Sequence, residues 1–227
     1  MAKVVRPPLL FVWLGVLLPP LKQALIKRDA MNNIQTKTIA IFAALAALMA
    51  ATRFNHFGSA VSLPDASLAV FFLGGLYLAV SARASIAAFI ALILEAGLID
   101  YYATSMQGVS DWCMTPAYWF LIPTYGSLWL VGRWFALRHT MQGKGLIGLA
   151  LVAWAANSFA FVFSNTTFYL FSEHFAKMSA VEYASRVAQY YGSYVSVALL
   201  YIACAVALHM AFDIMVKQRT HSRSDSL

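Results

Sequence analysis

The feature that most constrains this chain is a series of long apolar runs that are separated by short polar stretches. A helix needs about 20 mostly apolar residues to cross the hydrocarbon core of a membrane. The 227 residues therefore leave room for six such helices with short loops. The six predicted spans are Thr36–Arg53, Ala66–Val80, Ser85–Tyr101, Thr115–Trp134, Leu146–Phe163 and Tyr194–Val216.

Composition agrees with this interpretation. Only 11% of the residues are charged and 61% are hydrophobic, whereas about a quarter of the residues in a soluble domain are charged. Backbone polar groups in lipid must be satisfied internally, which leaves helix bundles or closed barrels. The apolar runs lack the period-2 alternation of barrel strands. The sequence therefore predicts an all-α integral membrane protein, a bundle of six transmembrane helices.

The basic residues indicate the orientation of the bundle. The net charge of +7 is not a nucleic-acid signal, because the charges fall in alternate loops between spans. Of the 16 Lys and Arg residues, thirteen lie on the side of the two termini, and only Arg53, Lys177 and Arg186 lie on the other. Cytoplasmic loops carry the excess of Lys and Arg. Both termini are therefore predicted to be cytoplasmic.

Residues 1–33 differ from the six-span domain, residues 34–216, and from a polar cytoplasmic tail, residues 217–227. Two basic residues precede a short apolar run, Leu9–Leu18, which Pro19 and Pro20 end. Three interpretations of this extension are open: a segment that resembles a signal peptide, a short interfacial anchor, or residues upstream of a true start at Met31.

The first predicted span carries small residues at four-residue spacing, among them Ala43, Ala47 and Ala51. Such a pattern lets two helices approach closely in lipid. It indicates either packing inside this bundle or a face on which a partner docks.

Cys113 is the most informative single residue. It lies between Trp112 and Tyr118 at the predicted outer boundary of the membrane, in a loop without Lys or Arg. One cysteine cannot supply the ligand set that a bare metal ion needs, but it can be an axial ligand to a metal that a macrocycle already holds. His56 and His174 are rival axial ligands. Cys204 is predicted to be a small core residue.

The outer loops are rich in polar and aromatic groups. They are Arg53, His56, Asp65, Asp100, Tyr101, Tyr102, Asp111, Trp112, Cys113, Tyr118, Asn165, Tyr169, His174, Arg186, Tyr190 and Tyr191. Aromatic belts and contacts with lipid headgroups explain part of this set equally well. A haem- or corrin-like cargo would use the aromatic rim for its large apolar faces. The sequence contains no motif that indicates a hydrolase or a nucleotide-binding site.

Three segments resemble BtuM-type cobalamin transporters, which are solitary substrate-binding (S) components of the energy-coupling-factor class. They are Arg53–Ser59 (RFNHFGS), Leu63–Gly75 (LPDASLAVFFLGG) and Trp112–Tyr118 (WCMTPAY). The resemblance covers about residues 34–216 and implies the six-helix S-component fold in a bacterial inner membrane. It also implies cobalamin as the transported substrate, bound at the outer face, and no other cofactor.

The resemblance further implies specific roles. Cys113 would coordinate cobalt and could remove cyanide from cyanocobalamin, while Tyr118, Asp100, Arg186 and His56 match other polar positions near the pocket. The alanine face of the first span would dock on a coupling subunit that works with ATPases, or serve self-association. Three alternatives stay open: an S component for another vitamin with a structural Cys113, a haem-binding or thiol-active membrane enzyme, and a structural membrane subunit.

Overall fold

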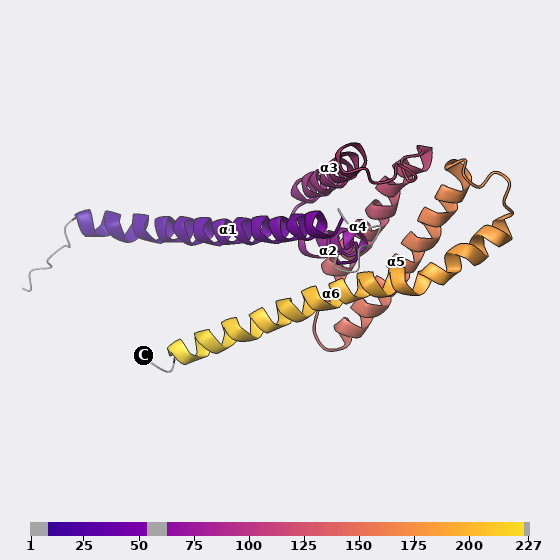
Figure 1. Cartoon of the computed structure of the whole chain (residues 1–227). Coiled ribbons are helices and arrows are strands. Elements are labelled where there is room, and N and C mark those ends of the chain that lie inside the picture. Colours follow the sequence, from indigo (N-terminus) through magenta and orange to yellow (C-terminus); the bar gives the residue numbers. More distant parts are fainter. Residues whose placement is uncertain (1–8, 54–62, 225–227) are drawn as a thin grey trace, which may run out of the picture. The chain divides into compact units, whose positions relative to one another are not determined.

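The computed structural model describes the backbone of residues 9–53 and 63–224, and the side chains of residues 31–53 and 63–219. Its elements are α1 (Leu9–Arg53), α2 (Ser67–Tyr77), α3 (Ala82–Met106), the 3-10 helix η1 (Pro116–Phe120), α4 (Leu121–Arg138), α5 (Lys144–Phe171) and α6 (Ala180–Ser224), as Figure 1 shows. These ranges contain no strand. The predicted all-α class is therefore confirmed.

Within the described residues, four helices are long and apolar enough to cross a membrane. They are Met31–Arg53, Ala82–Met106, Lys144–Phe171 and Ala180–Arg219. The chain is therefore a multi-pass membrane protein. The other two predicted spans correspond to α2, an apolar helix of 11 residues, and to α4, which has 18 residues. The count of six spans, and the cytoplasmic position of both termini, stay predictions.

The two predicted domain boundaries, after residues 33 and 216, fall inside helices and stay predictions. The helix α1 passes through Pro19 and Pro20 without a break, and the chain divides into compact units at Ile41 rather than at residue 33. The tail was expected to follow the last span as a separate polar segment. The structure shows that α6 continues as one helix through Ser224.

Prolines explain how the fourth span begins. Pro116 lies in the first turn of η1, and the side chain of Thr115 accepts a hydrogen bond from the backbone N–H of Ala117. Since α4 begins only at Leu121, Pro123 lies in its first turn. The backbone N–H groups of a first turn have no partner within the helix, so a proline is tolerated there.

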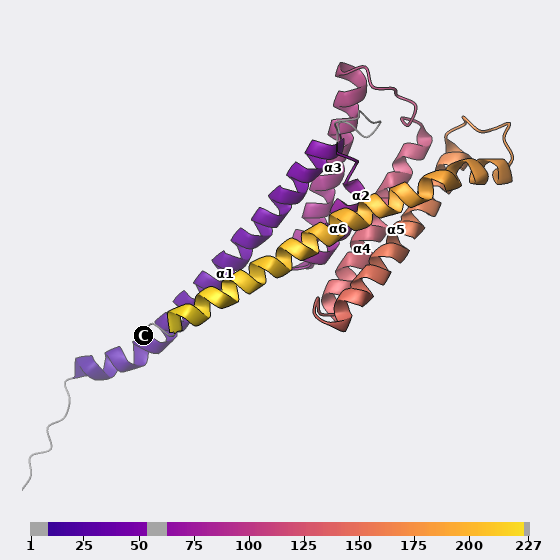
Figure 2. The same ribbon diagram turned by 60° about the horizontal axis from the view of Figure 1, so that its bottom comes forward.

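The core of the second unit is the contact between α2 and α4. Residues Ser67 to Leu76 are all buried, which explains why this segment reads as a continuous apolar run. Gly75 and Gly132 allow the two helices to touch, because a Cβ atom at either position would overlap a backbone oxygen of the other helix. The helix α2 also packs against α6. At one end of this unit lie both the connection before η1 and the connection between α5 and α6 (Figure 2).

Candidate functional site

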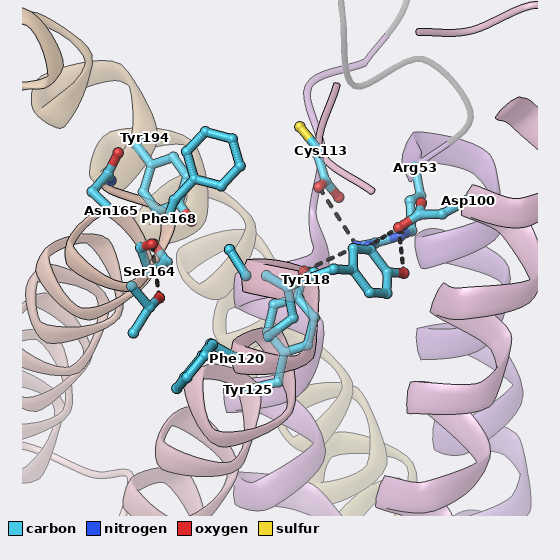
Figure 3. Close-up of a pocket in the computed structure, with 14 residues that line it drawn as sticks. Arg53, Asp100, Cys113, Tyr118, Phe120, Tyr125, Ser164, Asn165, Phe168 and Tyr194 are labelled. Atoms are coloured by element: carbon cyan, nitrogen blue, oxygen red, sulfur yellow. Dashed lines mark hydrogen bonds and ion pairs between the residues drawn. The ribbon is translucent and has the colours of Figure 1, made fainter. Parts of the chain in front are cut away.

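A cavity of about 290 Å³ lies at that end of the bundle, and Cys113 is among the residues that line it. On one side lie Arg53, Asp100, Cys113 and Tyr118, which come from α1, α3, the connection after α3, and η1. On the other side lie Ser164, Asn165 and Phe168 from α5 and Tyr194 from α6, as Figure 3 shows. The structure therefore places three of the predicted site residues, Cys113, Tyr118 and Asp100, at one cavity.

The connection that carries Cys113 is short and ordered by turns. The backbone N–H of Met114 donates to the carbonyl of Asp111 at 2.7 Å, and η1 starts directly afterwards. The thiol is half-buried and free of any disulfide. Burial raises the pKa of the Cys113 thiol, and the negative charge of Asp100 raises it further, while the positive charge of Arg53 opposes both effects. This environment therefore favours the protonated thiol.

Arg53 and Asp100 form a two-pronged ion pair beneath the thiol. The Nε of Arg53 donates to Oδ1 of Asp100 at 2.8 Å, and Nη2 donates to Oδ2 at 2.6 Å. Arg53 is 3% exposed and Asp100 is 7% exposed. The remaining nitrogen, Nη1, donates to the hydroxyl of Ser67 at 2.7 Å and to that of Tyr125 at 3.0 Å. One arginine thus joins α1, α2, α3 and α4.

Tyr118 completes this network. Its hydroxyl donates to Oδ2 of Asp100 at 2.7 Å, so both oxygens of that carboxylate already accept hydrogen bonds. Asp65 lies further out, with Oδ2 3.9 Å from Nη1 of Arg53. The direct role of Asp100 is therefore to hold the wall of the cavity and to set the charge near Cys113.

Trp112 and His174 join the two connections at the mouth. Their rings stack with centroids 3.8 Å apart, and Nε2 of His174 lies 3.0 Å from the carbonyl oxygen of Trp112. The ring of His174 also lies 6.0 Å from that of Phe168, which lines the cavity. In this position His174 fixes Trp112, the neighbour of Cys113.

Some other predicted residues that the structure describes do not line this cavity. Arg186 is exposed on α6, where its Nη2 donates to Oε1 of Glu182 at 2.9 Å. His56 lies outside the described residues. Cys204 is exposed on α6, so the prediction of a core cysteine is wrong. The alanine face (Ala43, Ala47 and Ala51) is exposed as well, so no residue among those described packs over it.

The sequence did not single out several residues of the site. Arg53 was recognised as an outer-loop residue but not as the partner of Asp100, although an arginine at the end of a span needs a counter-charge. Tyr125, Phe168 and Tyr194 lie within apolar helices, where nothing in the sequence distinguishes a cavity wall from a packed or lipid-facing side chain. No protein-family model matches this chain, and no curated protein matches it either.

Proposed function

We propose that this protein takes up cobalamin across a bacterial inner membrane, with Cys113 as the axial ligand to cobalt. The supporting observation is that Cys113, half-buried, lines a cavity at one end of a multi-pass helical bundle. A thiol that faced lipid, or that was sealed in the core, would not fit this role. The resemblance to BtuM-type S components supplies the identity of the substrate.

The donor set fits a metal that arrives inside a macrocycle. Among the described residues, no group of three or more His, Cys, Asp or Glu side chains is placed to hold a metal ion. A corrinoid brings four equatorial nitrogen ligands of its own, so one sulfur ligand suffices. The rings of Phe120, Phe168 and Tyr194 line the cavity and offer apolar surface to the corrin.

The size of the cavity limits how far the substrate enters. About 290 Å³ is at the lower end for a small-molecule site, and a whole cobalamin is larger. The corrin face therefore sits at the mouth, with cobalt directed at Cys113, until the cavity widens. Opposite the aromatic rings, the wall of Arg53, Asp100 and Tyr118 stays fixed by its hydrogen bonds.

Ligand exchange accounts for removal of cyanide without a reductant. The Cys113 thiol releases its proton to water, and the sulfur donates an electron pair to trivalent cobalt, while the nitrogen base that occupied this axial position leaves with its own electron pair. Cyanide leaves the opposite face with both electrons of its bond, and water takes its place. Cobalt stays trivalent, and the released cyanide takes up a proton. The chain then acts as a transporter with one chemical step, rather than as an enzyme that turns over.

The exposed alanine face of α1 is the proposed contact for a coupling subunit with its ATPases. If the protein acts alone, the same face would pair two copies. Small residues allow either contact, because they let helix backbones approach closely in lipid.

Visible spectroscopy of purified protein with cyanocobalamin tests the proposal. The wild type is expected to show a thiolate–cobalt spectrum and to release cyanide, while Cys113→Ala is expected to show neither. Cys204→Ala is the matched control, since it removes the other thiol of the chain, which is exposed on α6. Identical spectra for the wild type and Cys113→Ala would disprove the cobalt–sulfur bond.

A second experiment distinguishes cobalamin from haem and from other vitamins as the ligand. Cyanocobalamin, haemin and a panel of other vitamins are added in turn, and the shift of the thermal midpoint is measured. A shift with cobalamin alone supports the proposal. A shift with another vitamin that survives in Cys113→Ala would instead indicate an S component in which the thiol is structural.

A further inference from the structure

The charges that surround the Cys113 cavity do not balance. Three of the described residues that line it carry a formal charge: Arg53, Asp65 and Asp100. One positive and two negative charges leave this lining with a net charge of −1. The proposed ligand exchange at Cys113 does not involve Asp65, which lies just before the first residue turn of α2.

Arg53 compensates Asp100 rather than Asp65. Its Nε and Nη2 donate to the two oxygens of Asp100 at 2.8 and 2.6 Å (Figure 3), and Nη1 donates to hydroxyl groups of α2 and α4. Nη1 lies 3.9 Å from Oδ2 of Asp65, which is too far for a hydrogen bond. The other oxygen, Oδ1, accepts from the backbone N–H and the hydroxyl of Ser67 at 2.9 and 2.6 Å. The side chain of Asp65 is 31% exposed, so its Oδ2 is the acceptor that the described residues leave for a ligand.

Most other polar groups of the lining use their donors inside the protein. The hydroxyl of Tyr118 donates to Asp100 at 2.7 Å. On α5, Nδ2 of Asn165 and the hydroxyls of Ser164 and Thr167 all donate to backbone carbonyls of the same helix. Among the described residues, the cavity therefore offers a ligand a carboxylate oxygen but few free donors.

These features favour a ligand that brings N–H donors and no carboxylate. The corrin ring of cobalamin carries neutral carboxamide side chains, each of which ends in an NH₂ group. Haem, the rival macrocycle, carries propionate side chains instead, and these are anionic. A carboxylate on the substrate would meet the unbalanced charge of Asp65, and like charges brought together in this way suppress binding of the wrong partner.

Given the proposed function, on which this assignment rests, we propose that Asp65 selects macrocycles with carboxamide side chains over those with carboxylates. Its Oδ2 accepts a hydrogen bond from one carboxamide N–H of the bound corrinoid. The same oxygen repels a carboxylate in that place, so Asp65 makes both an attractive and a repulsive contribution to specificity. The bond to cobalt belongs to Cys113 alone.

The test compares cyanocobalamin with its monocarboxylic acids, in each of which one propionamide side chain has been hydrolysed to a propionate. Dissociation constants are measured by isothermal titration calorimetry with the full chain in detergent. Asp65→Asn removes the charge and keeps an oxygen that can accept from Ser67. Asp111→Asn is the matched control, because it removes the same charge from an exposed residue that does not line the cavity.

For the acid whose propionate meets Asp65, the wild type and Asp111→Asn are expected to bind about tenfold more weakly than they bind cyanocobalamin. This is the effect of losing one hydrogen bond to a charged group. Asp65→Asn is expected to bind cyanocobalamin and this acid with nearly equal affinity, because the repelling charge is gone. A tenfold difference that persists in Asp65→Asn, or no difference for any acid in the wild type, would overturn the role of Asp65.

The wild type also supplies a measurement that does not depend on folding of the variant. Salt screens partly exposed charges, so the difference between cyanocobalamin and this acid should shrink as salt is added. A difference that salt leaves unchanged would contradict a charge effect. Absence of any cobalamin binding would refute the proposed function itself, whereas equal binding of cyanocobalamin and all its acids would refute only the role of Asp65.

Discussion

Cys113 is held in an environment that favours the protonated form of its thiol. Burial and the charge of Asp100 both raise the thiol pKa, and Arg53 only partly offsets them. A protonated thiol is a weaker nucleophile than a thiolate, so this environment protects Cys113 from oxidation and from disulfide exchange. In the proposed function, cobalt would remove this protection, because as a strong Lewis acid it would compete with the proton for the sulfur.

This environment predicts how substrate binding depends on pH. Below the thiol pKa, each bound cobalt displaces one proton, so the apparent affinity should rise about tenfold per pH unit. Since the pKa is raised, that rise should continue above the ordinary thiol value of about 8.5 before it levels off. Titration of cobalamin at a series of pH values measures it. The Cys113→Ala variant should show a much flatter profile, and an equally steep one would refute the thiol as its source.

At the scale of elements, one charged pair joins the ends of four helices. Arg53 on α1 contacts Asp100 on α3, Ser67 on α2 and Tyr125 on α4. The partners are separated by up to 72 residues in the chain, so no local preference brings them together. Removal of one member of a buried pair leaves an uncompensated charge, and that cost exceeds the value of any single hydrogen bond.

Asp100→Asn should therefore destabilise the protein by about 3 kcal/mol or more. The measurement is the loss of folded protein on heating or in denaturant, in detergent. Glu182→Gln is the matched control. It also neutralises one acid of an Arg–carboxylate pair, but its side chains are 61% and 50% exposed, and such pairs contribute about 0–1 kcal/mol. Equal losses in the two variants would mean that the Arg53 network does not stabilise the bundle.

The sequence predicts the helices of this structure, but it does not predict which helices are buried or which side chains line the cavity. Apolar runs predicted helices correctly because burial in lipid or in a core requires them. They could not separate the buried α2 from a lipid-facing span, since both are apolar on all sides. Cys113 was found because a thiol beside aromatics at a span end is unusual. Tyr194 was missed, because only the packing of α5 and α6 makes it part of a wall.

At the scale of the whole molecule, the distribution of basic residues predicts that the cavity at Cys113 faces the outside of the cell. Membrane-impermeant maleimide applied to spheroplasts should therefore label Cys113 in a Cys204→Ser background, and cobalamin should block the reaction. Labelling is read as a mass shift of the purified chain. Labelling that requires lysis of the spheroplasts would reverse the predicted orientation. A Cys113→Ala, Cys204→Ser chain controls for other reactive groups.

The two sides of the Cys113 cavity are held by interactions of unequal strength. Displacing the side built on Arg53 would strip a desolvated charge of its counter-ion. The facing side meets it partly through uncharged ring contacts, such as Phe120 with Phe171 at 4.6 Å and Trp112 with His174. A bulky substrate would therefore be admitted by movement of α5 and α6. The wall that carries the thiol would keep its position.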